Sequence, residues 1–182
     1  MALLEAVRNS YVSSLSSAVR ASPGAHIEPV YRMSDGLPAL EGLLSLPARA
    51  DLIPTRGEGA GRPLMVNSAA QLEFEPVPIG SFGPGVSVSS FTWDSLTVRV
   101  RGLPEQEVAS RGAEWFVRWF DADDTNGPTS EGLYGVVHFM SEPASTGGWV
   151  EFSADLGSAP VAALEDLLLR LTDAGASEVR VG

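Results

Sequence analysis

An acidic stretch directly after an aromatic-rich helical segment is the first candidate for chemistry. In the sequence DADDTNG, Asp121, Asp123 and Thr125 stand at the first, third and fifth positions of an EF-hand calcium loop. The pattern then fails, because the glycine position holds Asn126 and the twelfth position holds Gly132. The segment that follows also alternates like a strand, whereas an EF-hand continues as a helix. The sequence therefore does not predict an EF-hand.

Two interpretations of this stretch stay open. Hard cations accept clustered carboxylates, so a calcium or magnesium site of another type is one of them, in a cation-binding protein or a metal-dependent enzyme. The carboxylates available to such a site are Asp121, Asp123, Asp124 and Glu131. The other interpretation is a helix stop and a solvated turn, where Asp and Asn are favoured for their turn geometry. In that case we expect no cofactor.

A second candidate is a set of charged and aromatic residues on one face of a predicted sheet. In the segment LTVRVR, residues 96–101, apolar and polar side chains alternate, as in a strand with one buried face. The same alternation in later segments predicts that several residues share the opposite face, namely Arg99, Arg101, Tyr134, His138, Trp149 and Glu151. Arginines beside aromatic rings suit a small anionic ligand or a partner peptide. Because this face is rather apolar, we expect the N-terminal ninety residues, a second subunit or a ligand to cover it.

The residue types that are missing restrict the chemistry. The chain has no lysine and no cysteine, which excludes a P-loop lysine, a Schiff base, a thiol nucleophile and a cysteine-ligated metal. No G-x-S-x-G turn presents a serine to His138, so we expect this histidine to be a buried or interface residue with a hydrogen-bond partner. Without a convergent nucleophile and base, the sequence favours a non-enzymatic protein.

The net charge of −11 is unevenly distributed. Residues 1–91 carry 8 acids and 6 arginines, whereas residues 92–182 carry 15 acids and 6 arginines. Such a field repels phosphate backbones and anionic lipids, so we do not expect binding to nucleic acid or to a membrane. An acidic surface suits a basic protein partner, as in an immunity or antitoxin-like role.

Hydrophobic periodicity predicts the following elements. Residues 2–21 have the apolar stripe of an amphipathic helix, and residues 72–75 alternate like an edge strand. From there the pattern predicts, in order, a strand, a helix, two strands, a helix and a strand, at residues 91–103, 104–120, 132–140, 148–156, 158–176 and 177–182. This order is that of the ferredoxin-like fold.

The expected protein is therefore of the α+β class. Residues 91–182 should form a ferredoxin-like βαββαβ domain, with an antiparallel sheet and both helices on one face. Residues 1–90 should be an N-terminal extension of one amphipathic helix, loops and an edge strand that packs on this domain. The N-terminal helix is too polar to span a bilayer, and a bacterial, cytoplasmic location is favoured.

Three functional hypotheses follow from these patterns. The first is a binding or protein-interaction module, with a protein partner or self-association. The second is the divalent-cation site in the acidic stretch. The third is a sensor of a small anion at the arginine-bearing sheet face.

Overall fold

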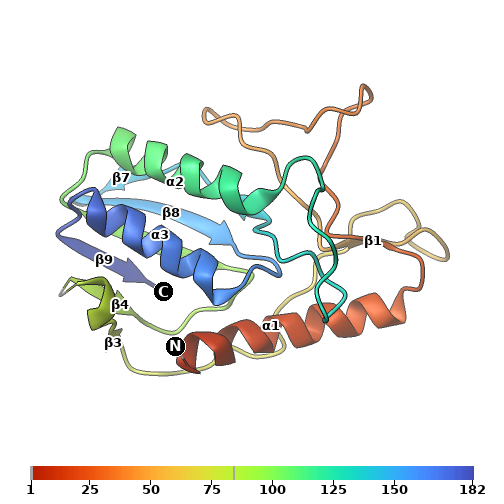
Figure 1. Ribbon diagram of the computed structural model, residues 1–182, viewed down its shortest axis with the longest axis horizontal. Coiled ribbons are helices and arrows are strands. Elements are labelled where there is room, and N and C mark those ends of the chain that lie inside the picture. Colours follow the sequence, from red (N-terminus) through yellow and green to blue (C-terminus); the bar gives the residue numbers. More distant parts are fainter. Residues whose placement is uncertain (1, 84) are drawn as a thin grey trace.

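The computed structural model describes residues 2–83 and 85–182 and has a mixed α+β architecture (Figure 1). Within these residues there are three α-helices and a mostly antiparallel sheet of seven strands. The helices are α1 (Ala2–Ala21), α2 (Glu105–Phe120) and α3 (Val161–Asp173), and a short 3₁₀ helix spans Gly80–Phe82. The strands are β1 (His26–Ile27), β2 (Leu52–Ile53), β3 (Val77–Pro78), β4 (Val86–Val88), β5 (Leu96–Arg101), β6 (Phe139–Met140), β7 (Ala144–Thr146), β8 (Trp149–Asp155) and β9 (Glu178–Val181).

The sheet has the strand order β3-β4-β9-β5-β8-β6, with β7 also paired to β8. Strands β4 and β9 are parallel, and every other pair in this sheet is antiparallel. The sheet is thus larger than the expected one and mixed. Two strands were not expected, β7 at Ala144–Thr146, which pairs with β8, and β4, a strand of only three residues at Val86–Val88 that joins the free edge of β9. Such a short strand has almost no periodicity that a sequence reading could detect.

Two expected strands differ in the structure. The edge strand begins at Val77, after the predicted residues 72–75, and the amide and carbonyl groups of Phe74 bond to the Ser90 hydroxyl. Of the predicted strand 132–140, only Phe139–Met140 pairs as β6. Gly132 and Gly135 have φ values of 77° and 70°, which interrupt an extended strand. The segment before β6 is therefore a loop.

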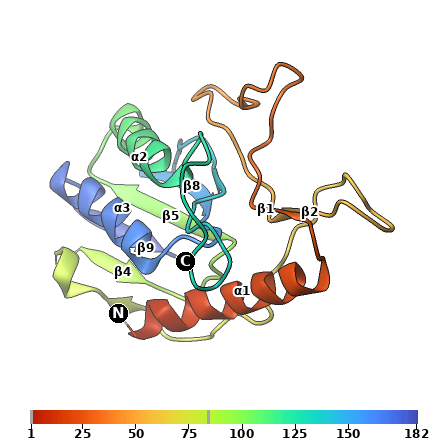
Figure 2. The same ribbon diagram turned by 45° about the vertical axis from the view of Figure 1, so that its right-hand side comes forward.

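Helices α2 and α3 lie side by side on one face of the sheet (Figures 1 and 2). The apolar side of β5 and the aromatic stripe of α2 meet in the core, where Val98, Val100, Trp115 and Phe116 are fully buried. The indole N–H of Trp115 donates to the carbonyl oxygen of Ala163, which links the two helices. Burial of these rings supplies much of the hydrophobic stabilisation of the domain.

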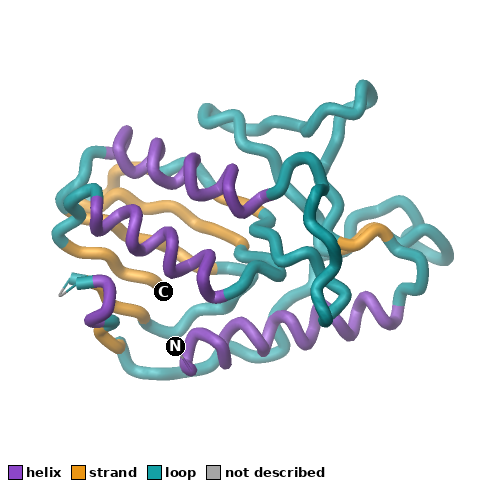
Figure 3. The backbone as a smooth tube through the Cα atoms, viewed as in Figure 1, coloured by secondary structure: helices purple, strands orange, loops and turns teal. Residues whose placement is uncertain are grey.

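The N-terminal part runs along the molecule's edge and beyond the end of the sheet. Helix α1 lies beside α3 and buries the stripe Leu4, Val7, Tyr11, Val12 and Leu15. Residues 22–70 are mostly loops, drawn in teal in Figure 3, with β1 and β2 as a short antiparallel pair. In the described part of the chain, no helix is both long and apolar enough to cross a membrane.

Candidate functional site

The face of the sheet opposite the helices carries a cluster of arginines around one tryptophan. Arg99 and Arg101 project from β5, Arg180 from β9 and Trp149 from β8. The guanidinium carbons of Arg101 and Arg180 lie 4.0 and 4.7 Å from the centroid of the Trp149 ring. At these distances both cations are attracted by the face of the ring. The two contacts bring arginines of β5 and β9 together at Trp149 of β8.

Ion pairs connect these arginines to two glutamates. Arg99 Nε lies 2.6 Å from Glu151 Oε2, and Arg101 and Arg180 both pair with Glu178. Arg99 and Arg180 stand directly opposite each other on β5 and β9, an arrangement of like charges that lowers stability. The side chains of the three arginines are about half exposed, at 49 to 55%. The chain therefore presents this positive cluster to solvent.

A groove borders the cluster and has a volume of about 490 Å³. Its lining includes Arg99 and Arg180, together with the hydroxyl-bearing residues Ser87, Ser89 and Thr97. Hydroxyl groups and guanidinium groups are both donors to anionic oxygens. We call the arginine cluster, Trp149, the two glutamates and this groove the open sheet face.

Four of the residues predicted for this face come together on it, namely Arg99, Arg101, Trp149 and Glu151. Tyr134 and His138 do not join them, because residues 132–138 form a loop and not a strand. Arg180 and Glu178 belong to the face as well, and the polar positions of the alternating strand β9 are the sequence signal for them.

The carboxylates of the acidic stretch form hydrogen bonds and ion pairs with other residues of the chain. Asp121 is the C-terminal capping residue of α2. Its carboxylate accepts hydrogen bonds from the backbone of Thr125 and Asn126 and from the Thr125 hydroxyl. Burial by itself would raise the pKa of Asp121, but these hydrogen bonds and the nearby Arg49 hold it below its ordinary value. Asp124 pairs with Arg32 and Arg49 at 2.8 and 2.9 Å.

Glu131 pairs with Arg8 of α1, 3.0 Å away, and Asp123 is exposed. The carboxylates of Asp121, Asp123, Asp124 and Glu131 do not converge as ligands of one ion in the described part of the chain. The stretch instead fastens the end of α2 to the N-terminal loops through Arg32 and Arg49.

A second polar cluster is buried where the N-terminal loops meet the sheet. His138 lies just before β6, is fully buried and, as expected from the sequence, has a hydrogen-bond partner. Its Nε2 is 2.8 Å from Oε1 of Glu28, and its Nδ1 is 3.0 Å from Oδ1 of Asp51 and 3.8 Å from Oδ2 of Asp155. We call these four residues the histidine cluster.

Backbone and hydroxyl donors orient the three carboxylates of the histidine cluster. Glu28 accepts from the amides of Ser158 and Tyr134, at 3.1 and 2.7 Å. Asp51 accepts from the Tyr11 hydroxyl, at 2.5 Å, and from the Val66 amide. Asp155 accepts from the Gly157 amide, at 2.8 Å. These donors favour the ionised form of each acid.

Two backbone positions show how closely the histidine cluster is packed. Glu28 has a φ of 47°, in the left-handed region that non-glycine residues seldom adopt, and this turn directs its side chain at His138. Gly157 has a φ of 50°, and a Cβ there would overlap the His138 ring and the carbonyl oxygen of Val136. The surrounding contacts therefore determine the position of the ring.

The electrostatics of the cluster follow from one imidazole among three acids. Burial by itself would lower the pKa of His138, but its contacts with Asp51 and Glu28 and the charge of Asp155 raise it to about 10. Burial raises the pKa of Asp155 to about 7. Burial opposes ionisation of Glu28 and Asp51 too, yet the adjacent His138 imidazole and the donors to each carboxylate keep both pKa values below the ordinary value.

Sequence reasoning did not find the three acids of the histidine cluster. Glu28 and Asp51 lie in loops without periodicity, and they meet His138 only through the tertiary fold. Asp155 ends β8, where alternation predicts a position but not a partner. The sequence signal that could have indicated a buried acid is a single acidic residue between apolar neighbours, as where Asp51 stands between Ala50 and Leu52.

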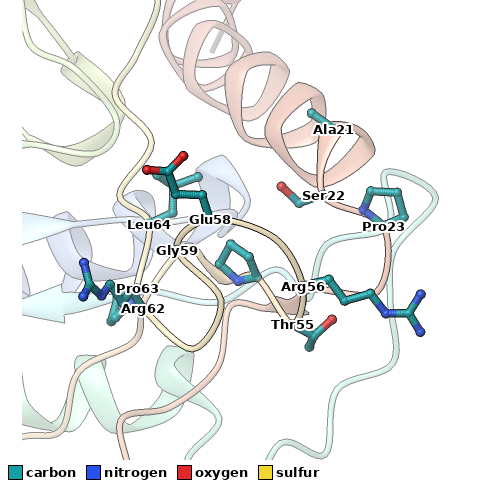
Figure 4. A pocket seen from close by; sticks show the side chains of 11 residues that line it. Ala21, Ser22, Pro23, Thr55, Arg56, Glu58, Gly59, Arg62, Pro63 and Leu64 are labelled. Atoms are coloured by element: carbon teal, nitrogen blue, oxygen red, sulfur yellow. The ribbon is translucent and has the colours of Figure 1, made fainter.

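A further hollow of about 540 Å³ lies between the end of α1 and the loop of residues 54–64 (Figure 4). Arg56 and Arg62 lie on opposite sides of it, and their guanidinium groups do not point toward one another. The two guanidinium groups therefore do not converge on one point of this hollow.

Comparisons of the chain with models of protein families, with curated proteins and with solved structures found no match. The function is therefore argued from the residues of this chain alone.

Proposed function

We propose that the protein is a non-enzymatic binding module whose open sheet face binds an acidic segment of a partner protein. The observation that carries the proposal is the pair of guanidinium groups over Trp149 on an exposed sheet face. Aromatic and arginine side chains are the residues most enriched among the energetic hot spots of interfaces. Trp149, which two arginines contact, is an anchor of that type.

The charge of the open sheet face supports an acidic partner. Three arginines stand there with two glutamates, and Arg99 faces Arg180 directly. Among the described residues, Arg99 bonds only through Nε, so its terminal nitrogens are available to an incoming carboxylate. An arginine and a carboxylate can form two parallel hydrogen bonds, which gives both affinity and orientation.

The distribution of charge favours a second candidate, an immunity-like module for a basic partner. Residues 92–182 carry 15 acids and 6 arginines, and three of those arginines lie on the open sheet face. The rest of this half of the chain is therefore strongly acidic. A basic protein would bind there, away from Trp149, and its association would be steered by the acidic field.

The architecture we propose for residues 96–181 is a ferredoxin-like unit. Supporting it, β9, β5, β8 and β6 are neighbours in that order, and each adjoining pair is antiparallel. In this view β3, β4 and β7 are additions at its edges. The additions leave the outer side of the central strands exposed, which is the surface that the proposed partner would cover.

Fluorescence anisotropy with labelled peptides tests the proposed function. We expect a glutamate-rich peptide to bind the full chain and a lysine-rich peptide of equal length not to bind. Arg180→Gln should weaken binding roughly tenfold, because a hydrogen bond to a charged group is lost. Binding should also weaken as salt is raised.

The matched control is Arg111→Gln, which removes an arginine of similar exposure that pairs with Glu107 and Glu114 on α2. This variant should bind the acidic peptide as the natural protein does. Binding of the lysine-rich peptide, unchanged by Arg180→Gln, would overturn the first candidate and favour the second. Binding of a small dicarboxylate as tightly as the peptide would instead indicate a small-anion sensor.

A further inference from the structure

We infer that His138, Asp51 and Asp155 form a binding site for one divalent transition-metal ion of the zinc type. The ligand atoms would be Nδ1 of the histidine and one oxygen of each aspartate. This site is separate from the open sheet face and independent of the function proposed for it.

The spacing of the three atoms fits the coordination of such an ion. Nδ1 of His138 lies 3.0 Å from Asp51 Oδ1 and 3.8 Å from Asp155 Oδ2, and one ligand atom from each residue can be chosen so that all three lie within 4.8 Å of one another. Zinc binds nitrogen and oxygen at about 2.0–2.2 Å, so two ligands of a tetrahedral ion are separated by about 3.3–3.6 Å. The two observed separations from Nδ1 bracket that value.

The second observation is that the fully buried Nδ1 of His138 has no hydrogen-bond partner among the described residues. Asp51 Oδ1 is close enough, but it lies out of line with the direction in which the ring nitrogen would donate or accept. A buried polar atom without a partner costs free energy, so an occupant is expected. An ion on the Nδ1 lone pair, beside both aspartates, would satisfy it.

Glu28 prepares the histidine for this role. Its Oε1 lies 2.8 Å from Nε2 of His138, and two backbone amides hold its carboxylate in place. A histidine that binds a metal typically donates its other ring N–H to a carboxylate, which determines the tautomer and orients the ring. With the proton kept on Nε2, an ion that displaces the proton of Nδ1 would find its lone pair beside the Asp51 and Asp155 carboxylates. Glu28 is thus a positioning residue.

The charge of the cluster also calls for a cation. Three carboxylates surround a single imidazole in a buried space. The nearest buried arginine, Arg49, directs its N–H groups to the carbonyl oxygens of Phe120, Glu28 and Asp121 and pairs with Asp124. It does not neutralise the histidine cluster. Buried charge without compensation is costly, and a divalent ion supplies the missing positive charge.

The ligand set selects the class of ion. Imidazole nitrogen suits zinc and its neighbours in the first transition row, whereas calcium and magnesium prefer six or more oxygen ligands or retain several waters. The side chain of Asp155 is 12% exposed, so this side of the site lies close to solvent. Once bound, the ion would connect the loop of Asp51 to Asp155 at the end of β8 and to His138 just before β6. Its role would be structural.

Zinc chloride is the probe for this inference. The purified full chain is treated with a chelator, dialysed, and titrated with zinc by calorimetry, with thermal midpoints measured in parallel. We expect one zinc per chain and a rise of the midpoint by several degrees, because a ligand of the native state stabilises it. Calcium and magnesium should produce no such rise. A natural chain that binds no stoichiometric zinc would overturn the inference.

Two matched variants locate the ion. Asp155→Asn should weaken zinc binding by more than about tenfold, since even loss of a residue that only supports a ligand has that effect. Asp123→Asn makes the same change at an exposed position of the acidic stretch and should leave the affinity unchanged. If only Asp123→Asn lost zinc binding, the ion would have to bind at the acidic stretch. That result would overturn the site at His138, Asp51 and Asp155.

A spectroscopic measurement on the natural chain avoids the risk that a variant fails to fold. Nitrogen-15 NMR of the histidine ring distinguishes a protonated, a neutral and a metal-bound nitrogen. We expect the Nδ1 resonance of His138 to move to the metal-bound position when one equivalent of zinc is added, with Nε2 remaining protonated. An Nδ1 that stays protonated at saturating zinc would contradict the inference.

Discussion

The open sheet face and the histidine cluster use the same kinds of groups in opposite surroundings. On the face, arginines pair with Glu151 and Glu178 while about half of each arginine side chain is exposed. In the cluster, His138 meets Glu28 and Asp51 with almost no exposure. Water screens the first set, so each pair contributes at most about 1 kcal/mol to the free energy of unfolding. The second set has no such screening, and the loss of one member leaves the others buried and unpaired.

Because of this difference in exposure, the charged groups of the open sheet face can change their ion-pair partners, whereas those of the histidine cluster cannot. The residues of the open sheet face can exchange an internal ion pair for a carboxylate of a partner at little cost. The residues of the histidine cluster join segments that are distant in the sequence, since Glu28 and His138 are 110 residues apart. We therefore expect the histidine cluster to contribute more to the stability of the fold than the open sheet face does. Three substitutions test this difference.

Replacement of the histidine should have the largest effect. His138→Leu removes the only imidazole of the cluster and leaves three buried carboxylates without it. We expect the free energy of unfolding to fall by about 3–5 kcal/mol, the cost of breaking a buried ion pair from one side. Urea denaturation of the chelator-treated protein measures this change. A loss below about 1 kcal/mol would mean that the cluster is no more important to stability than the surface pairs.

A methyl group at residue 157 should have an intermediate effect. Gly157→Ala puts a Cβ against the His138 ring and the Val136 carbonyl at a positive φ, so we expect a loss of about 1–3 kcal/mol beyond the backbone term. The control is Gly147→Ala, where φ is 57° but the Cβ would meet open space. That variant should show only the backbone term, about 1–2 kcal/mol. Thermal unfolding measures the loss of stability in both variants. Equal losses would contradict the close packing around His138.

Removal of a surface charge should have the smallest effect. Glu151→Gln breaks the ion pair with Arg99 on the open sheet face, and the free energy of unfolding should change by less than about 1 kcal/mol. The same change should strengthen binding of an acidic peptide, because a competing carboxylate is removed. Denaturation and anisotropy on one preparation check both results. A large loss of stability with no gain in affinity would mean that Glu151 serves the fold.

The regular elements were predictable because their patterns are local. The alternation of 96–101 and the aromatic stripe of 105–120 each bury one side, so their composition predicts both the element and its buried face. The prediction failed at 132–138, where apolar residues resemble a strand. There the amides of Tyr134 and Gly135 donate to Glu28 and to the Ser158 hydroxyl, so the backbone is satisfied without a strand partner.

The sequence by itself determined the α+β class, the positions of the three helices and the alternation that aligns Arg99, Arg101 and Trp149 on one surface. These features depend on residues a few positions apart, whose geometry is set by the period of a helix or a strand. Only the tertiary structure decided that Glu28, Asp51 and Asp155 surround His138. Those contacts join loops and strands whose approach depends on packing of the whole chain, and no local period encodes it.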